Sequence, residues 1–490
     1  IKRIRKAIEN GEDILVYGDY DADGICATTI LWETLFKITK KVLPYIPERL
    51  SEGYGLNENS IKNLKLKNEN LSLIITVDHG ITAGEKIKFA KNLGIDIIVC
   101  DHHQIGKEKP VCEAVVHTDQ VCAAAISWFV SRELANSADY LDLVAIASIA
   151  DLESLVGINR SFVKFGLEAL NKTCRLGILS ILEEAGIEKG KIGTYEVGFI
   201  IAPRLNAMGR MGHALESLRL ICTNHKDKAK GLAQKLGLTN KERQELTEEI
   251  TLHARNLFLE EYKDNFPKLI IVSHESYKEG VIGLAAGKLT EEFYRPAIVI
   301  SKGGVYSKAS ARSISGFNII EAIRAVSELI VEAGGHPMAA GFTVETVKIE
   351  EFKERILKEA EKQITEEILE KSLKIDLELP FLLASLDLWK EIQNLTPFGL
   401  GNPEPVFAAE AAVKDLRKVG ATGKHLKIVL GFGEKDFIEG IGFNLGERAE
   451  ELALGDRVKV VYNLTLNEWN GNKKIEAKIK DIKLLNDRRA

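Results

Sequence analysis

The sequence predicts an α/β protein in which a parallel-sheet domain, a long connecting helix and a second α/β domain precede a small β-barrel. Up to about residue 120, short apolar runs such as DILVYG and LSLIITV alternate with segments of helical periodicity, the βαβ pattern of a parallel sheet. Residues 226–263 contain no proline and carry apolar residues at helical spacing. After the turn-rich TPFGLGNPEPVF, short alternating runs such as HLKIVLGF are typical of a β-barrel.

The remaining elements follow from the same patterns. KKVLPYI and IDIIVC complete the first sheet, and segments such as ATTILWETLFKI are its helices. From about residue 125 to 222, segments such as LDLVAIASIAD predict helices that continue this domain. KLIIVS and PAIVIS belong to the second α/β unit, which ends in a helix at about residue 365. We expect four parts, with the second an exposed connecting helix: 1–225, 226–263, 264–365 and 366–490.

Composition says more about the cellular compartment of the protein than about its function. The 490 residues are 45% hydrophobic, enough for sizeable buried cores. The net charge of -5 gives no general signal for nucleic acid or an anionic membrane, so any basic surface must be local. Six cysteines without CxxC spacing favour reduced thiols. No apolar run approaches the roughly 20 residues that span a bilayer, and we expect a cytoplasmic protein without membrane contact.

Three predicted strands end in acidic residues. LVYGDYDADG carries Asp19, Asp21 and Asp23, LIITVDHG carries Asp78, and IIVCDHH carries Asp101 followed by two histidines. Ligands of open parallel sheets gather at the carboxyl ends of the strands, so we expect these carboxylates to converge on one crevice. The alternative for the first motif is a cluster of Asx turns, and Asp19 in particular can serve only to shape the loop.

Convergent carboxylates repel one another, which raises their pKa values, and divalent cations would relieve the repulsion. Carboxylate and imidazole without thiolate favour Mn²⁺ or Mg²⁺ over structural zinc. Two ions roughly 3.5–4 Å apart need a bridging carboxylate and several further ligands. Asp151, which closes an apolar helix, is a fourth acid, unless it serves only as a helix-end residue. Of His102 and His103, which point in different directions, we expect one to bind metal and the other to face the substrate.

These motifs resemble a known superfamily. DYDADG, VDHG and DHH, followed by an acid after a helix, resemble the DHH phosphoesterases, and GGHPMAAGF resembles the glycine-rich signature of their associated C-terminal domain. PERLSEGYGL, PRLNAMGR, SARSISGFNIIEAI and PFGLGNPEPVF resemble the RecJ family of single-strand-specific 5'→3' exonucleases. The resemblance covers nearly the whole chain. It implies a DHH catalytic domain, a connecting helix, a DHH-associated domain and a terminal OB-fold barrel.

The resemblance implies two-metal hydrolysis of single-stranded DNA to 5'-mononucleotides, in DNA repair and recombination. The metal ligands of two Mn²⁺ or Mg²⁺ ions would be Asp21, Asp23, Asp78, His102 and Asp151, and Asp101 and His103 would support the site or the scissile phosphate. The residues that would hold the 5' end and the phosphates are Arg49, Arg204, Arg210, Ser310, Arg312, Gly334, Gly335 and His336. We place Ser310 and Arg312 in a loop rich in small residues.

Each of these assignments has a structural alternative. The arginines can form surface ion pairs, and the two glycines before His336 can serve a tight turn. In the barrel, Phe432 and Trp469 are candidate stacking surfaces among lysines, although a barrel also has ordinary core aromatics. The chain departs from the family at His79, where cysteine is common, and after Asp151, where LESLVGINR replaces a more apolar stretch.

The expected partners are single-stranded DNA with a 5' end, a helicase and a single-strand-binding protein, and we expect a monomer. One alternative is a DHH phosphodiesterase that acts on short oligonucleotides or cyclic dinucleotides, against which the terminal β-unit argues. The other is a catalytically silent scaffold, like the eukaryotic replicative-helicase component related to the superfamily. The full set of acidic ligands argues against that alternative.

Overall fold

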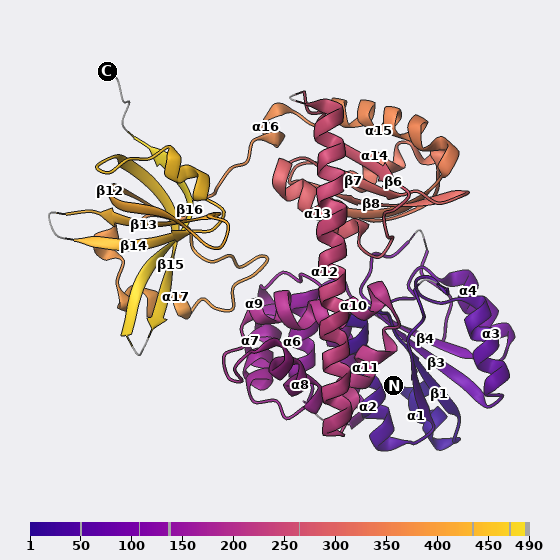
Figure 1. Ribbon diagram of the computed structural model, residues 1–490. Coiled ribbons are helices and arrows are strands. Elements are labelled where there is room, and N and C mark those ends of the chain that lie inside the picture. Colours follow the sequence, from indigo (N-terminus) through magenta and orange to yellow (C-terminus); the bar gives the residue numbers. More distant parts are fainter. Residues whose placement is uncertain are drawn as a thin grey trace. The chain divides into compact units, whose positions relative to one another are not determined.

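The first sheet contains five parallel strands in the order β2-β1-β3-β4-β5 (Figure 1). Its strands are β1 (Asp13–Tyr17), β2 (Val42–Tyr45), β3 (Leu71–Val77), β4 (Asp96–Asp101) and β5 (Ala114–His117). Alternate residues of β1 enter two different cores, Ile14 and Val16 on one face and Leu15 and Tyr17 on the other. Because both faces are covered, the strands read as continuous apolar runs. The sequence predicted the first four strands, and it missed the four-residue edge strand β5.

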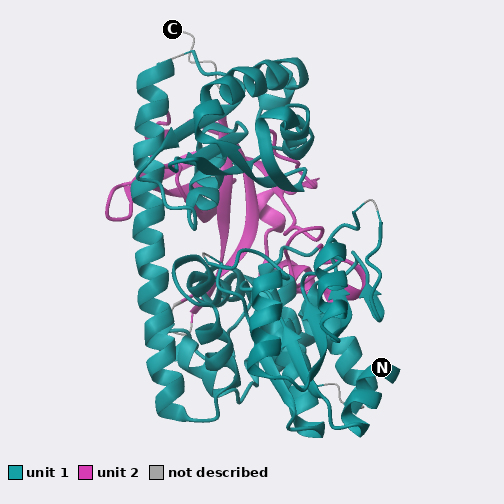
Figure 2. Ribbon diagram, turned by 90° about the vertical axis from the view of Figure 1, so that its right-hand side faces the viewer, with its two compact units in different colours: residues 1–153, 161–371 teal, residues 154–160, 372–490 magenta. Residues whose placement is uncertain are grey.

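The computed structural model describes residues 1–49, 51–106, 108–135, 139–263, 265–433, 436–469 and 472–485. Figure 2 colours two compact units, of which the first contains residues 1–153 and 161–371 and the second residues 154–160 and 372–490. Among the described residues, no helix is both long and apolar enough to cross a membrane.

Helices cover both faces of the first sheet and continue into a helical region. They are α1 (Lys2–Glu9), α2 (Ala22–Ile38), α3 (Glu58–Lys67), α4 (Gly84–Asn92), α5 (Ala123–Ala135), α6 (Leu141–Ala150), α7 (Gly157–Asn171), α8 (Leu176–Ala185), α9 (Thr194–Glu196), α10 (Ala202–Met211) and α11 (Leu215–Cys222), with a π-helix at Val197–Ile201. The helical region between residues 123 and 222 agrees with the sequence prediction.

Helix α12 (Lys226–Tyr262) is not the exposed connection expected from the sequence. Ala229, Ala233 and Leu236 are buried in the core of the first α/β part, and Ala254 and Phe258 are buried in a core of the second. A charge-rich helix buries one narrow stripe while its other faces stay solvated, and composition alone does not reveal that stripe. The helix therefore belongs to both cores, and Figure 1 shows it as one long uninterrupted helix.

The second sheet has the order β6-β7-β8-β10-β9. Strands β6 and β7 are parallel, and the remaining neighbours are antiparallel. The elements here are β6 (Ile270–His274), α13 (Ile282–Phe293), β7 (Ala297–Ser301), β8 (Tyr306–Arg312), α14 (Ile319–Arg324), β9 (Ile330–His336), β10 (Ala339–Glu345), α15 (Ile349–Gln363) and α16 (Glu366–Leu369). Ser310 and Arg312 lie on β8 rather than in a loop. Small residues suit this strand because it is paired on both sides and packs against α13.

Unit 2 is built on a closed barrel. Its elements are β11 (Leu377–Glu378), α17 (Leu386–Gln393), β12 (Phe407–Val419), β13 (His425–Gly431), β14 (Phe437–Gly442), β15 (Arg457–Trp469) and β16 (Asn472–Leu484). The strand order is β11-β12-β13-β14-β16-β15, and pairing between β12 and β15 closes the barrel. Inward residues such as Leu426, Ile428 and Leu430 alternate with the less buried His425, Lys427 and Val429, which is the alternation read from the sequence.

A test of this packing is Gly177→Ala, at the second residue of α8. A Cβ atom here would lie 2.0 Å from the carbonyl oxygen of Leu220 in α11, so the two helices would have to separate. We expect the free energy of unfolding to fall by about 1–3 kcal/mol. The matched control is Gly231→Ala in α12, where a Cβ atom meets nothing within 4 Å and should stabilise the helix by about 1 kcal/mol. Calorimetric unfolding of both variants separates them, and equal shifts would contradict the packing argument.

Candidate metal centre

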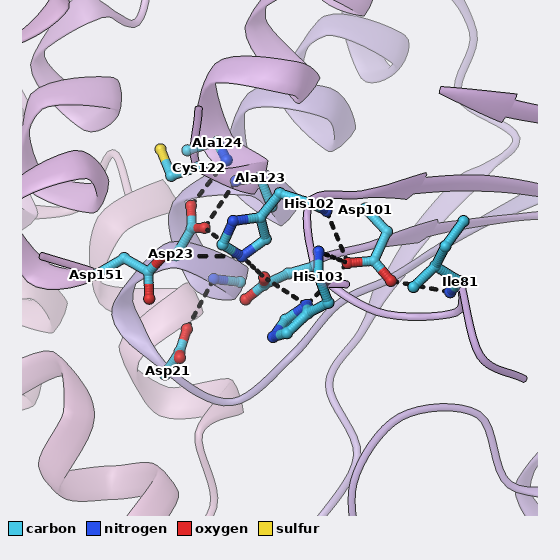
Figure 3. Close-up of polar contacts among 12 residues, drawn as sticks. Asp21, Asp23, Ile81, Asp101, His102, His103, Cys122, Ala123, Ala124 and Asp151 are labelled. Carbon is cyan, nitrogen blue, oxygen red and sulfur yellow. Dashed lines mark hydrogen bonds and ion pairs between the residues drawn. The ribbon is translucent and has the colours of Figure 1, made fainter. Parts of the chain in front are cut away.

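The strand order brings the predicted acids to one end of the first sheet. β1, β3 and β4 are neighbours, as expected, and each runs into one of the acidic motifs. Asp21 is the N-cap of α2 and Asp23 lies in its first turn, just beyond β1. Asp78 follows β3, and Asp101 is the last residue of β4. Figure 3 shows Asp21, Asp23 and Asp151 on the same side of His102.

Backbone amides fix the first two carboxylates. Asp21 Oδ1 accepts from the Gly24 amide at 3.0 Å, so this residue does cap α2. Both oxygens of Asp23 accept at 2.7 Å, one from Ala123 N and the other from Ala124 N, at the start of α5. The N-terminus of a helix stabilises negative charge, so α5 holds a buried carboxylate in place.

His102 and His103 point to different acids. His102 Nε2 lies 3.2 Å from Asp78 Oδ1, 3.7 Å from Asp151 Oδ2 and 3.8 Å from Asp23 Oδ2. His103 Nδ1 instead lies 2.8 Å from Asp101 Oδ1. Asp151 reaches this group because it is the C-cap of α6.

Asp101 organises the turn that carries both histidines. Its Oδ1 accepts from the backbone amides of His102 and His103 and faces the His103 ring, and its Oδ2 accepts from the Ile81 amide. Burial opposes ionisation of Asp101, but the hydrogen bonds from His103 and Ile81 outweigh it and lower its pKa to about 2. These contacts favour the supporting role over that of a metal ligand.

The other carboxylates destabilise one another when ionised. Burial, assisted by neighbouring carboxylates, raises the pKa of Asp151 to about 8 and holds the pKa values of Asp19 and Asp78 well above the ordinary range. Burial likewise raises the pKa of Asp23 to about 6, and Asp21 adds to the effect. Burial alone would lower the pKa of His102, but Asp78 and the nearby Glu153 raise it to about 12. Without cations, protons must neutralise this group.

The residues fit divalent cations. Three groups of side chains offer ligand atoms within 4.8 Å of one another: Asp78, His102 and His103; Asp23, His102 and Asp151; Asp19, Asp21 and Asp78. Asp19 Oδ1 is buried without a hydrogen-bond partner among the described residues, and buried Asp78 Oδ1 has only the His102 ring at 3.2 Å. Oxygen ligands with one imidazole suit Mn²⁺ and Mg²⁺. Asp19, which the sequence left as a loop-shaping residue, therefore stands within reach of a cation.

Several residues that hold the site were not identified from the sequence. Tyr54 Oη donates to the carbonyl oxygen of Asp78 at 3.1 Å, and Asp78 has the left-handed φ of 69°. Asn206 Oδ1 accepts from the Ala22 amide at 2.7 Å, and His117 Nε2 donates to the His103 carbonyl at 2.7 Å. Tyr54 and Asn206 lie within quoted motifs, which was the available signal. His117 lies on the missed strand β5 and had none.

His79 supports the fold beside this site. Its ring is buried, and its Nε2 donates to the Tyr17 carbonyl at 3.0 Å. Burial lowers its pKa to about 4, so the ring is neutral near pH 7. The departure from the family at this position thus gives a neutral ring that braces the loop after β3 against β1.

Four arginines from separate elements gather beside the acids. They are Arg49 after β2, Arg210 of α10, Arg243 of α12 and Arg312 of β8. Burial, assisted by the charges of the other three, lowers the pKa of Arg210 to about 10, while Asp21 acts in the opposite direction. None of the four forms an ion pair with a carboxylate in the described part of the chain. Arg243 was not predicted; Asn240 Oδ1, one turn earlier on α12, accepts from its guanidinium at 3.0 Å.

Strands β8 and β9 carry the remaining candidates. Arg312 and His336 both lie opposite Ala339 of β10, so they share one end of the second sheet, two strands apart. Burial lowers the pKa of His336, and the charges of His103 and His102 add to this, which places His336 near the acidic group. Gly335 has φ 145° and a Cβ atom there would lie 2.3 Å from the Ala339 carbonyl, so the glycine is needed for the hairpin itself. At Gly334 a Cβ atom would meet open space, which leaves room for a ligand.

Arg204 faces away from this group. Its Nε lies 2.6 Å from Glu184 Oε2 of α8, and its Nη1 donates to the Ile200 carbonyl at 3.0 Å. This is the ion pair that the sequence left open as the alternative. A phosphate-binding role for Arg204 stays a prediction that these contacts do not favour.

Comparison with known proteins identifies the family to which the chain belongs. Three family models match in order: the N-terminal domain of the DHH family over residues 13–148, the DHHA1 domain over 266–366 and the RecJ OB domain over 375–481. The single-stranded-DNA-specific exonuclease RecJ of Thermus thermophilus is 33% identical over 98% of this chain and 70% of its own. The chain belongs to the RecJ family.

Other RecJ proteins give the same result. The Bacillus subtilis protein is 37% identical over 98% of this chain, which spans 62% of that relative's length. The crystal structure of T. thermophilus RecJ with Mn²⁺ superposes with a TM-score of 0.86 at 29% identity, over 98% of this chain and 70% of that one. Its complex with Mg²⁺ gives 0.76 at 28% identity, over 98% and 69%. The predicted family and the predicted order of DHH, associated and OB parts are therefore confirmed.

The repulsion among the acids can be tested with Asp78→Asn. Without metal, this variant should unfold at the temperature of the parent or above it, because a neutral amide replaces a buried carboxyl group that repels its neighbours when ionised. Mn²⁺ should raise the unfolding temperature of the parent by mass action, and the variant should lose most of this rise. Scanning calorimetry in EDTA and in Mn²⁺ measures both effects.

The control is Asp101→Asn. This carboxylate accepts hydrogen bonds from backbone amides, so the change should lower the free energy of unfolding by about 2 kcal/mol or more in both buffers. A full Mn²⁺-dependent rise in Asp78→Asn would remove Asp78 from the metal site.

Proposed function

We propose that this RecJ-family chain is a metal-dependent 5'→3' exonuclease that hydrolyses single-stranded DNA to 5'-mononucleotides. The observation that carries the proposal is the meeting of two oppositely charged groups, the buried acids at the ends of β1, β3 and β4 and the four arginines, which form no ion pair with a carboxylate among the described residues. The relatives from B. subtilis and T. thermophilus are named single-stranded-DNA-specific exonucleases, which supports the same reaction.

The cations would be held by Asp21, Asp23, Asp78, His102 and Asp151, with Asp19 as a further oxygen donor. When bound, two such ions stabilise the charge that develops on a phosphate under attack and provide a nucleophile at neutral pH. The protein keeps the ligands in place before substrate arrives, since Asp23 is fixed by α5 amides and Asp151 by the end of α6. Asp101 and His103 keep the histidine turn in register, and His103 faces the substrate side.

The arginine group suits the terminal phosphate of a strand. A 5'-phosphate is a dianion, and guanidinium groups bind it through paired hydrogen bonds. Arg312 Nη1 donates to the Ala311 carbonyl at 2.8 Å, which holds the side chain beside Ser310. Arg210 is half-buried and donates to the Gly280 carbonyl, just before α13. These contacts orient the arginines without neutralising them, which supports a 5' end as the substrate.

The OB barrel offers a surface for single-stranded bases on β13 and β14. These are the second and third strands of the barrel, counted from β12, and such folds bind oligonucleotides on this face. Phe437, the first residue of β14, and Phe443, which follows its last residue, are 54% and 53% exposed. Lys474 Nζ lies 5.2 Å from the ring centre of Phe437, and Lys478 Nζ lies 6.0 Å from that of Phe443. Aromatic rings beside lysines suit stacked bases and phosphates.

Phe432 and Trp469, the stacking candidates named from the sequence, are less suitable for binding bases than Phe437 and Phe443. Phe432 is half-buried and packs against the core residue Phe381, with 6.0 Å between the ring centres. The side chain of Trp469 lies outside the described residues. Phe437 and Phe443 are therefore the stacking residues of this proposal.

The proposal includes the setting that the family resemblance implies. It places the enzyme in the cytoplasm, in DNA repair and recombination, with a helicase and a single-strand-binding protein as partners. All six cysteines are free thiols, which agrees with a reducing compartment. The four-part division at residues 225, 263 and 365 remains part of the proposal.

The decisive experiment digests a long single-stranded DNA labelled separately at each end, with Mn²⁺, with Mg²⁺ and with EDTA. Metal-dependent release of mononucleotides from the 5' end is the expected result. Rapid hydrolysis of dinucleotides without cleavage of the long strand would assign the chain to the small-substrate phosphodiesterases. Tight DNA binding without hydrolysis of either substrate would make it a scaffold.

Arg312→Ala should reduce the preference for a 5'-phosphorylated end, because a half-buried guanidinium next to Ser310 is lost. The matched control is Arg204→Ala, which breaks the pair with Glu184 and should leave the preference unchanged. The measurement is the ratio of cleavage rates for phosphorylated and hydroxyl-ended strands. An unchanged ratio in Arg312→Ala, or an equal loss in both variants, would contradict the assignment.

Phe437→Ala and Phe443→Ala should each weaken binding of an oligothymidylate by about 1–3 kcal/mol, roughly 5- to 150-fold. Leu454→Ala is the control, since Leu454 is an exposed apolar residue of the same unit at 67% exposure. Fluorescence anisotropy in EDTA measures binding without cleavage. Parent-like affinity in both phenylalanine variants would exclude this face.

A further inference from the structure

Each nitrogen of the His102 ring faces carboxylates. Nε2 lies against Asp78, Asp23 and Asp151, as described above. Nδ1 lies on the other side of the ring, 3.6 Å from Glu153 Oε1. The His102 and Glu153 side chains are 13% and 14% exposed, so both are largely withdrawn from water.

The turn after α6 places Glu153 at this position. The Glu153 amide donates to the Ser148 carbonyl at 3.0 Å and the Leu152 amide to the Ile149 carbonyl at 3.3 Å, the two bonds of a Schellman motif around the C-cap Asp151. Leu152 occupies the left-handed position with φ 58°, where glycine is usual. A leucine in this conformation costs about 1–2 kcal/mol, so the turn is kept at some expense to stability.

We propose that Glu153 is a positioning residue for the metal centre. Its carboxylate accepts a hydrogen bond from the Nδ1–H group of His102, and this keeps Nε2 unprotonated and free to bind a cation. The inference rests on the proposed function, because it assumes that the acids around Nε2 hold metal. Asp151 and Glu153 then act from one turn on opposite sides of the His102 ring. Asp151 lies on the Nε2 side, where the metal would bind, and Glu153 lies on the Nδ1 side, where the ring carries its proton.

The chemistry of imidazole supports this division. A neutral imidazole carries one proton, and it can ligate a metal only through the nitrogen that lacks it. Which nitrogen this is depends on the acceptor that the other nitrogen meets, and a carboxylate in that place also raises the basicity of the ligand. The separation of 3.6 Å is longer than a hydrogen bond, and a small rotation of the Glu153 side chain or one bridging water closes it.

A simple stabilising ion pair is the competing explanation. In that case the loss of Glu153 would lower the unfolding temperature and leave metal affinity as it was. The test therefore measures Mn²⁺ binding itself, by the electron paramagnetic resonance signal of free Mn²⁺ in titrations of the full chain without DNA, with calorimetric unfolding in EDTA alongside.

Glu153→Ala should weaken Mn²⁺ binding about 10- to 100-fold, while saturating Mn²⁺ restores most of the turnover. Glu153→Gln keeps an oxygen that can accept the Nδ1 proton and should recover most of the affinity. The matched control is Glu168→Gln on α7, an exposed glutamate of the same unit, which should bind Mn²⁺ like the parent.

Parent-like Mn²⁺ affinity in Glu153→Ala would overturn the inference, whatever the change in unfolding temperature. Equal losses in Glu153→Ala and Glu153→Gln would overturn it too, because charge rather than the acceptor would then matter. Binding is read without substrate, so a parent protein that binds Mn²⁺ but cleaves no DNA would refute the proposed function and leave this inference to be judged on its own result.

Discussion

The mutual repulsion of buried carboxylates at the ends of β1, β3 and β4 is the constraint on which the rest of the structure depends. Each of these acids would adopt a different position if it were free to separate from the others. Asp23 is fixed by two α5 amides and Asp78 is held at a left-handed φ of 69°, while the end of α6 adds the more exposed Asp151 to the group. The cores on both faces of the sheet supply the stability that keeps these groups together. Under the proposed function, the acids thus form a cation site before the cations bind.

The arginines repeat this arrangement with the opposite charge. Burial and the neighbouring guanidinium groups lower the pKa of Arg210, and Arg49 partly offsets the burial and repulsion that raise the pKa of Asp19. The two groups thus influence each other without closing into ion pairs among the described residues. Under the proposed function a strand needs both, since its scissile phosphodiester must approach the cations that the acids hold while its 5'-terminal phosphate meets positive charge. Paired arginines would be neutralised and would have little affinity left for phosphate.

The sequence predicted what depends on local pattern and adjacency. Apolar runs identified four strands of the first sheet, and the rule for carboxyl ends identified the acids. The prediction from sequence failed where the contacts of a residue depend on which face of a helix it occupies. Arg204 and Arg210 belong to one motif and one helix, but six residues turn the helix by about 240°, so the first meets Glu184 and the second Gly280. The buried stripe of α12 was missed for the same reason.

Residues that act through a turn or a missed strand were also out of reach. Glu153 owes its place to a Schellman turn with leucine in the position where glycine is the usual signal. His117 owes its place to a four-residue edge strand. No local pattern marks either residue, because its partner is distant in the sequence. His117 meets the carbonyl of His103, 14 residues away, and Glu153 faces the ring of His102, 51 residues away.

Under the proposed function, the two units divide the recognition of a strand by chemistry. Unit 1 offers charges, which recognise phosphate in any sequence and lose strength as salt rises. Unit 2 offers aromatic faces beside lysines, and every base has a π-face that can stack on them. Neither unit needs the hydrogen-bonding edge of a base. An enzyme that must digest whatever strand it meets requires this indifference to sequence, and under the proposed function it follows from the residue types of the two surfaces.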